Sequence, residues 1–149
     1  MCARNVKVLV IGPFGAGKTT LIKTVCPNAV LTERPLKVPL GSKKTFTVAL
    51  DYGVVEMNGT KVHLFGAPGQ ERFSFMLDVL ARGVDALIVL LHGSEGGKYI
   101  EFAKKLGKPY IVALTGPSSD SPRSLRLNIC DRKEILKVLG ELLSRVQRG

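Results

Sequence analysis

The sequence has few cysteines and no long hydrophobic run. It contains three cysteines, Cys2, Cys26 and Cys130, and no two of them have the short spacing of a metal-binding pair. An odd number of unpaired cysteines favours a reduced intracellular compartment over a disulfide framework. The longest apolar stretch, Ala86 to Leu91, is far shorter than the ~20 residues of a membrane span, and no secretory leader is recognisable. We therefore expect a cytoplasmic protein.

Acidic residues are also scarce. There are 12 Asp and Glu residues against 22 Lys and Arg residues, which gives a net charge of +10. Such a charge permits nucleic acid, an anionic membrane or a phosphorylated ligand as a partner. No nucleic-acid-binding motif accompanies it, so nucleic acid is not expected. Membrane association would rest on charge alone, because neither a myristoylation nor a prenylation motif is present.

The chain does contain a regular alternation of apolar and amphipathic segments. Its 149 residues suffice for one core, so we predict a single domain over 1–149. Short runs of Val, Ile and Leu alternate with amphipathic stretches, which predicts an α/β fold of three layers with a mostly parallel sheet of about six strands. Predicted strands are 5–11, 45–55, 61–65, 85–91, 110–114 and 125–129; predicted helices are 17–24, 70–82, 97–106 and a final one carrying Ile135, Leu139, Leu142 and Val146. Asn58-Gly59 predicts a tight hairpin and hence one antiparallel strand.

A phosphate-binding loop follows the first predicted strand. The run Gly12-Pro13-Phe14-Gly15-Ala16-Gly17-Lys18-Thr19 fits G-x-x-x-x-G-K-[ST] and lies between a strand and a helix start. Glycines let successive backbone N–H groups face one anion, and the helix dipole adds positive potential. Lys18 is expected to reach the β and γ phosphates, and the Thr19 hydroxyl to bind Mg²⁺, with Thr20 next to the phosphates. This pattern predicts a nucleoside triphosphate site.

A second motif extends this interpretation. The segment Gly66-Ala67-Pro68-Gly69-Gln70-Glu71-Arg72-Phe73 resembles the switch II motif of Ras-like small GTPases, and Thr47 to Tyr52 resembles switch I with its following strand. The resemblance covers residues 5–115 and is strongest to the prokaryotic branch that includes MglA and archaeal Arf-like proteins. It implies the P-loop NTPase fold of small GTPases, shortened near the base-recognition end.

The resemblance also implies roles for individual residues. Gly69 would donate its N–H to the γ phosphate, and Gln70 would orient the attacking water. Thr47 would bind Mg²⁺, although Thr45 is an alternative because a loop of this length can shift by two residues. The expected activity is slow hydrolysis of GTP to GDP and phosphate, catalysed with Gln70 and Lys18. The switch regions would then signal to an effector or activating protein.

Two positions depart from the family pattern. Gly66 stands where the switch II motif has an aspartate that holds a magnesium-bound water, so we expect either a weaker metal affinity or the approach of another carboxylate, for example Asp51. The base-recognition motif [Asn/Thr]-Lys-x-Asp is replaced by Thr115-Gly116-Pro117-Ser118-Ser119-Asp120, which lacks the lysine. Thr115 and Asp120 are the candidate base-side residues, and 128–131 is the candidate for the final base-side loop. Guanine and adenine therefore both stay open.

Two alternative functions follow from these departures. The chain could be a degenerate nucleotide-binding scaffold without useful turnover. A small P-loop kinase or ATPase is less favoured, because the sheet and its helices leave little length for a substrate-binding insertion. Candidate arginine fingers are Arg34, Arg72 and Arg82, each of which is also explained as a surface or structural residue. The apolar residues Phe73, Phe75, Met76, Val79 and Leu80 exceed one buried stripe, so they could form part of a partner-binding face.

Overall fold

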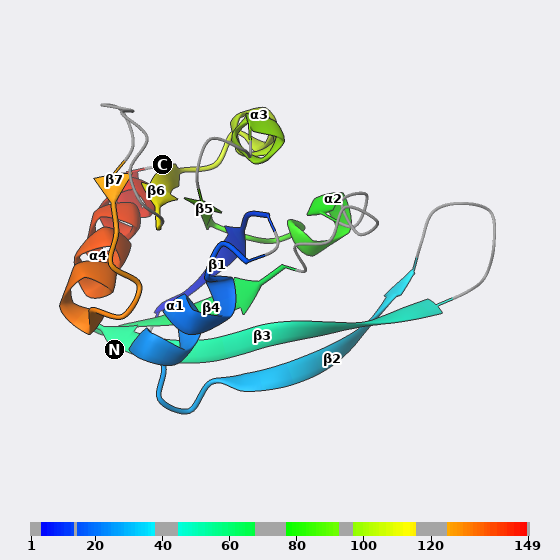
Figure 1. Cartoon of the computed structure of the whole chain (residues 1–149), viewed down its shortest axis with the longest axis horizontal. Coiled ribbons are helices and arrows are strands. Elements are labelled where there is room, and N and C mark those ends of the chain that lie inside the picture. The colour runs from blue at the N-terminus through cyan, green and yellow to red at the C-terminus, as the bar shows by residue number, and fades with distance from the viewer. Residues whose placement is uncertain are drawn as a thin grey trace.

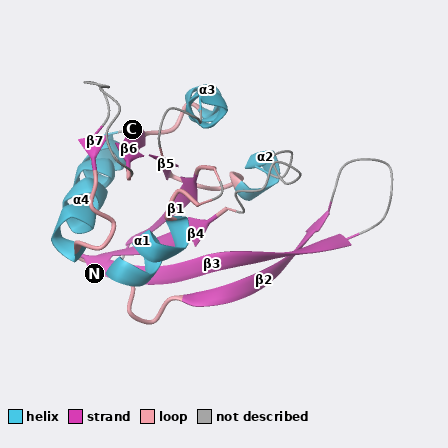
Figure 2. Cartoon of the chain, in the orientation of Figure 1, coloured by secondary structure: helices cyan, strands magenta, loops and turns pink. Residues whose placement is uncertain are grey.

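A computed structural model describes residues 4–13, 15–37, 45–67, 77–92, 97–115 and 125–148. For residues 31–37, 45–49, 78–79, 125–126 and 147–148 it describes the backbone only. The strands are β1 (Arg4–Ile11), β2 (Val30–Lys37), β3 (Thr45–Met57), β4 (Thr60–Gly66), β5 (Ala86–Leu91), β6 (Tyr110–Leu114) and β7 (Leu125–Arg126). The helices are α1 (Lys18–Val25), α2 (Leu77–Leu80), α3 (Gly97–Leu106) and α4 (Arg132–Arg148). Figure 2 shows these helices surrounding a single sheet.

The sheet is mostly parallel, as the alternation of the sequence predicts. Its seven strands lie in the order β2-β3-β4-β1-β5-β6-β7. All neighbours from β4 to β7 are parallel, whereas β3 runs antiparallel to both β2 and β4. One strand, β3, thus opposes all the others, which confirms the predicted P-loop NTPase architecture. The β3–β4 hairpin turns at Asn58 and Gly59, both with positive φ (49° and 79°), as a tight hairpin turn requires.

Both faces of the central strands are buried, which is the reason that they appear as continuous apolar runs. On β1, Val8 and Val10 face a core shared with α1 and α4, while Leu9 and Ile11 face a second core shared with α2 and α3. Side chains of β5 alternate in the same way. Figure 1 shows the two helix pairs on opposite sides of the sheet. This arrangement gives three layers and brings the carboxyl ends of the parallel strands to one edge, where α/β folds bind ligands.

The segment between α1 and β3 contains a strand that the sequence did not predict. Residues 30–37 form β2, which pairs along β3 from Val30↔Tyr52 to Lys37↔Thr45. Pro35 is tolerated because β2 is the outermost strand, where a missing N–H removes no bond from a central ladder. Figure 1 shows the β2–β3 ribbon projecting beyond the rest of the sheet. The candidate finger Arg34 therefore lies in an edge strand, opposite Val48.

Other boundaries differ only slightly from the predictions. The described part of the helix predicted over 70–82 is α2, which ends at Leu80, and residues 68–76 lie outside the described residues. The strand predicted over 125–129 has two residues, because Asn128 begins a turn in which its Oδ1 accepts a hydrogen bond from the Cys130 N–H at 3.0 Å. The hairpin strands β3 and β4 extend to the turn itself.

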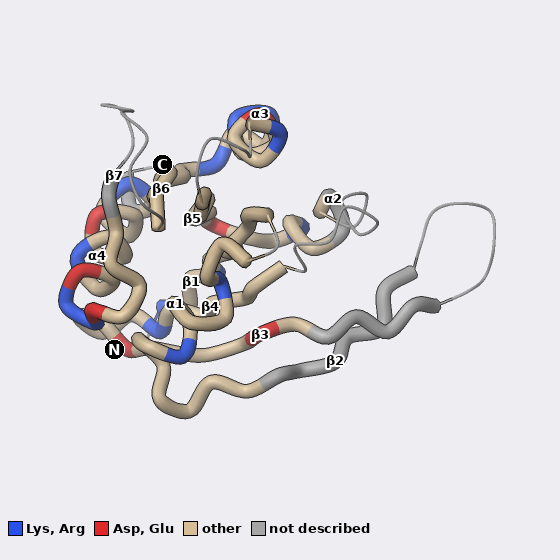
Figure 3. The backbone as a smooth tube through the Cα atoms, viewed as in Figure 1, with Lys and Arg blue, Asp and Glu red and all other residues tan. Residues whose placement is uncertain are grey.

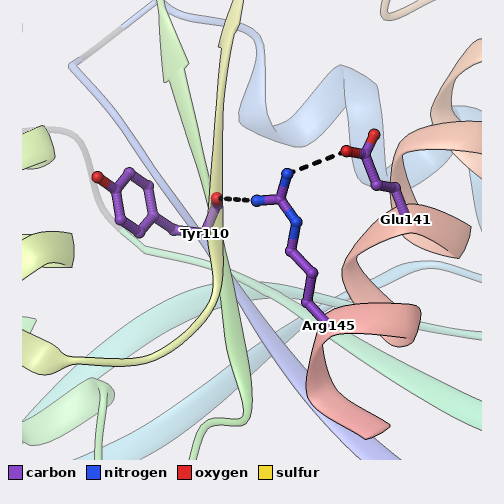
Figure 4. Close-up of polar contacts among 3 residues, drawn as sticks. All are labelled: Tyr110, Glu141 and Arg145. Carbon is purple, nitrogen blue, oxygen red and sulfur yellow. Dashed lines mark hydrogen bonds and ion pairs between the residues drawn. The ribbon is translucent and has the colours of Figure 1, made fainter. Parts of the chain in front are cut away.

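The final helix is attached to the sheet by packing and by one polar contact. Ile135, Leu139 and Leu142 are fully buried on its inner face. Arg145 donates from one guanidinium nitrogen to the Tyr110 carbonyl at 3.2 Å and from the other to Glu141 at 3.0 Å (Figure 4). An exposed ion pair of this kind contributes little free energy, so the buried leucines hold α4 in place.

Two of the helices are rich in basic residues. Figure 3 shows Lys and Arg along α3 and α4, whose described exposed members include Lys98, Lys104, Arg132, Lys133 and Lys137. In the part of the chain that the structure describes, no helix is both long and apolar enough to cross a membrane.

Candidate nucleotide-binding site

The predicted phosphate-binding loop connects β1 to α1 at the ligand-binding edge of the sheet. Ile11 ends the buried strand and Lys18 begins the helix. A turn between them is closed by the Ala16 N–H, which donates to the Pro13 carbonyl at 3.2 Å. Gly15 and Gly17 have φ values of 81° and 101°, a left-handed conformation that side chains other than glycine's rarely adopt. The described part of the loop therefore has the curvature that its glycine spacing predicts.

Gly12 is required for another reason, a close approach of the loop to the sheet. A Cβ placed on Gly12 would lie 2.1 Å from the carbonyl oxygen of Leu90 on β5. No side chain fits there without moving the backbone. Gly17 is crowded by a side chain instead, since a Cβ on it would lie 2.4 Å from the Cδ1 of Ile129. The turn that carries Ile129 therefore packs against the start of α1, next to the loop, where the sequence predicted the final base-side segment.

Lys18 is the principal cation of the site. Its Nζ donates to the carbonyl oxygens of Gly12 at 2.8 Å and Pro13 at 2.9 Å, so the side chain lies along its own loop. The residue is only 8% exposed. Burial lowers the pKa of Lys18 to about 8, and the negative charge of Asp51 acts in the opposite direction. An anionic ligand at the loop would raise this pKa again, because an opposite charge favours the charged state of a lysine.

Thr19 lies beside a carboxylate from a different strand. Its Oγ1 donates a hydrogen bond to Oδ2 of Asp51 on β3 at 2.5 Å. Asp51 in turn pairs across the sheet with Gly66, the last residue of β4. The approach of Asp51 that the sequence left as one alternative is therefore present in the structure.

Thr115 connects the base-side edge to the phosphate loop. It follows β6 directly, and its Oγ1 lies 2.7 Å from the Ala16 carbonyl and 3.3 Å from the Leu91 carbonyl. The Thr115 N–H donates to the same Leu91 carbonyl at 2.9 Å. The shorter contact shows that the hydroxyl supports the loop backbone. Thr115 is thus a positioning residue in this structure, with its hydroxyl proton engaged by Ala16.

The structure brings together only part of the predicted site. Gly12, Pro13, Gly15, Ala16, Gly17, Lys18, Thr19, Thr20 and Thr115 lie within the described edge of the sheet. Phe14, Gly69, Gln70 and Asp120 lie outside the described residues. Thr47 is placed by its backbone in β3, opposite Pro35. It lies four residues before Asp51, which at ~3.3 Å per residue is about 13 Å along the strand. Thr45 is farther still.

Other titratable groups near this edge have structural partners. His63 Nδ1 lies 2.9 Å from the Tyr52 hydroxyl, and Nε2 lies 3.0 Å from Oδ1 of Asn5. Burial and the charges of Lys7 and Lys61 lower the pKa of His63, which favours the neutral ring that this pairing needs. Burial likewise raises the pKa of the Cys26 thiol to about 11. The hydrogen bonds of His63 and the burial of the Cys26 thiol give both residues a structural role.

The donor set fits a magnesium ion held together with a nucleotide. Mg²⁺ in phosphate sites is bound through one or two protein oxygens plus waters and phosphate oxygens. The Thr19 hydroxyl and the Asp51 carboxylate are oxygen donors of that kind, side by side. Among the described residues, no group of three or more His, Cys, Asp or Glu side chains could hold a metal without such a ligand. The arrangement therefore fits an ion that binds only together with a nucleotide.

Comparison with known proteins gives a consistent result. A family model described as "50S ribosome-binding GTPase" matches residues 7–116. An uncharacterized protein of Methanocaldococcus jannaschii, MJ1339, is 32% identical over 139 residues, which cover 89% of this chain and 84% of that protein. The Ras-related protein Rab-32C of Dictyostelium discoideum is 28% identical over 100 residues, which cover 66% of this chain and 41% of that protein.

Solved structures share the fold. The FeoB G-domain from Methanococcus jannaschii superposes with a TM-score of 0.65 at 13% identity, covering 97% of this chain and 99% of that chain. The G domain of the T. maritima FeoB iron transporter has a TM-score of 0.54 at 20% identity, covering 97% and 98%. At identities this low, the structural match establishes a common fold and nothing further.

Proposed function

Because this chain belongs to the family described as 50S ribosome-binding GTPases, we propose that it is a switch protein that binds GTP and GDP with Mg²⁺ and hydrolyses GTP slowly. The observation that carries this proposal is the loop between β1 and α1. It combines a buried Lys18, a curved glycine backbone and a helix start whose first turn holds no acidic residue. That combination is suited to the β and γ phosphates of a nucleoside triphosphate.

The chain's own residues have defined parts in the proposed reaction. Lys18 exchanges its two backbone partners, Gly12 and Pro13, for phosphate oxygens, and backbone N–H groups of the loop surround the β phosphate. Thr19, with Thr47 from β3, would hold Mg²⁺, which when bound neutralises phosphate charge. Since Thr47 lies far along β3 from Thr19, its participation requires the β2–β3 ribbon to rearrange. Such a rearrangement is what a γ-phosphate-dependent switch would report to a partner protein.

Gln70 is proposed to orient the attacking water. We expect Gln70→Ala to lower the single-turnover rate of GTP hydrolysis about tenfold, because one hydrogen bond to the water is lost at about 1.4 kcal/mol. The measurement is rapid mixing of a preformed GTP complex with Mg²⁺, followed by quantification of released phosphate. Gln147→Ala, which replaces the other glutamine of the chain, is the matched control. A rate unchanged by Gln70→Ala would remove Gln70 from the mechanism.

A second candidate function is a nucleotide-binding scaffold without turnover. It is favoured by Gly66 and by the absence of lysine between Thr115 and Asp120, since both positions depart from the small GTPase pattern. The finer assignment to the MglA and Arf-like branch, and the identity of an effector or activating protein, are likewise proposals that rest on the sequence motifs.

Calorimetry with GTP and ATP, each with Mg²⁺, separates these functions. We expect tight binding of GTP and weak binding of ATP. Equal affinities would point to a pocket that has lost guanine recognition, and no binding of either would reject the site. Tight GTP binding without phosphate release over hours would favour the scaffold.

A further inference from the structure

Gly66 is opposite an acidic residue in the sheet, and the two positions compete for the same space. The β3–β4 register pairs Asp51 directly with Gly66. A Cβ placed on Gly66 would lie 3.2 Å from the Cβ of Asp51 and 3.4 Å from its Oδ2. The Asp51 carboxylate therefore reaches within van der Waals contact of the point where a side chain at position 66 would begin.

The Asp51 carboxylate has the surroundings expected of a residue next to a bound cation. Its Oδ2 accepts the Thr19 hydroxyl proton at 2.5 Å, and its charge acts on Lys18. A hydroxyl that binds a cation through its oxygen lone pair must direct its proton away from the cation, toward an acceptor. Asp51 supplies that acceptor and a negative charge at the same position. No other Asp or Glu among the described residues is hydrogen-bonded to the phosphate loop or to the first turn of α1.

Packing around Gly66 leaves little room for a side chain at this position. A Cβ there would also lie 3.1 Å from Cδ1 of Ile22, which is fully buried on α1. An aspartate at position 66 would also bring a second negative charge near Asp51, and like charges disfavour the ionised form of each other. The tight packing at Gly66 therefore disfavours a second carboxylate beside Asp51.

We propose that Asp51 supplies, from the neighbouring strand, the carboxylate that position 66 lacks, and that it positions the nucleotide-bound divalent cation together with Thr19. This inference rests on the proposed function, because the ion is held only together with a nucleotide. Moving the carboxylate from β4 to β3 has a structural consequence. β4 leads into the segment that carries Gln70, whereas Asp51 on β3 is paired with Leu31 of β2. The cation is then coupled to the β2–β3 ribbon.

The test compares GDP affinity with Mg²⁺ and with EDTA. In Asp51→Asn, which keeps an oxygen acceptor for Thr19 but removes the charge, we expect the Mg²⁺-dependent gain in affinity to fall about 10- to 100-fold, as for residues that orient metal ligands. The affinity in EDTA should stay equal or rise, because a negative charge near the phosphates is removed. Glu56→Gln, which removes an exposed charge from the same strand, is the matched control and should change neither value.

A reciprocal exchange makes the test specific to the pair. Gly66→Asp alone should destabilise the protein, because its side chain meets Asp51 and Ile22 at contact distance. Asp51→Gly combined with Gly66→Asp returns the carboxylate to β4, and it should recover the Mg²⁺-dependent gain to within a few-fold of the wild type. Thermal denaturation of each variant establishes that it is folded before titration. Should the double variant not fold, the Asp51→Asn titration alone decides.

The outcomes separate the two proposals. If Asp51→Asn lowers GDP affinity equally in Mg²⁺ and in EDTA, or leaves the Mg²⁺-dependent gain unchanged, Asp51 does not position the cation and this inference is wrong while the nucleotide site stands. If the wild-type chain binds GDP and GTP in neither condition, the proposed function fails and this inference fails with it.

Discussion

Replacing Lys18 with alanine is expected to weaken GTP binding about 100- to 1,000-fold. The Lys18 ammonium is buried next to the loop, with its two hydrogen bonds made to the Gly12 and Pro13 carbonyls. Two charge-assisted hydrogen bonds to phosphate contribute about 1.5–3 kcal/mol each. Part of this gain is offset because the bonds to the two carbonyls are lost. A change of about 1.4 kcal/mol corresponds to a tenfold change in the dissociation constant. The measurement is a calorimetric titration with GTP and Mg²⁺ for the variant and the wild type.

Lys23→Ala is the matched control for this experiment. Lys23 is exposed and lies in the last turn of the same helix, so its replacement removes the same charge without touching the loop. We expect its GTP affinity to stay within about twofold of the wild type, because exposed charges at this distance are screened by salt. Equal losses in both variants would indicate a general charge effect, and the assignment of Lys18 to the phosphates would be wrong.

The same residue gives the binding a defined pH dependence. Phosphate binding needs the charged ammonium, and burial lowers the pKa of Lys18 in the free protein to about 8. Below pH 8 the group is already protonated and the affinity should be level. Above pH 8 the protein must take up a proton on binding GTP. The GTP affinity should therefore fall as the pH rises, with a slope that approaches tenfold per pH unit. In Lys18→Ala the affinity should show no such fall between pH 7 and 9.5.

Replacing Leu139 with alanine is expected to lower the free energy of unfolding by about 2–5 kcal/mol. Leu139 is fully buried on α4, in the core that α4 shares with α1 and the sheet. Removing three carbons there leaves a cavity in addition to the lost burial, and buried leucines cost this much in other proteins. Since folded domains are stable by only about 5–15 kcal/mol, the midpoint of urea unfolding should fall by a large fraction.

Leu136→Ala on the same helix is the comparison that isolates burial. Leu136 is partly buried against the same core, and both changes replace leucine with alanine within α4, so the helix-propensity contribution is similar. We expect a loss of about 1 kcal/mol for Leu136→Ala, in proportion to the smaller apolar area removed from water. A loss for Leu139→Ala no larger than for Leu136→Ala would contradict the described packing of α4.

Most of the fold was predictable, because it depends on patterns that are local in sequence. Val8 to Ile11 and Ala86 to Leu91 are continuous apolar runs because both faces of a central parallel strand are buried. Asn58-Gly59 marks a hairpin because positive φ is needed at both positions. β2 was not predictable in this way: an edge strand has one partner, so Pro35 and its polar neighbours do not disturb the sheet and leave no strand pattern.

The functional site also has one part that was predictable from local sequence and one part that was not. The motif from Gly12 to Thr19 identified the phosphate loop from sequence alone, since one short segment supplies the glycines, the lysine and the hydroxyl. The contact between Thr115 and the Ala16 carbonyl joins positions 99 residues apart, and only the packing of β6 beside β5 brings it about. The turn with Ile129 reaches Gly17 in the same way.

By itself, the sequence determined that this protein has a phosphate-binding loop on a mostly parallel sheet, because those features depend on residues that are adjacent or close in the chain. Only the tertiary structure decided which carboxylate stands beside that loop. Asp51 and Gly66 lie opposite each other across the β3–β4 hairpin, and the packing of α1 on this sheet brings the Thr19 hydroxyl to the Asp51 oxygen. This contact depends on how a helix packs against the sheet, so no local motif in the sequence records it.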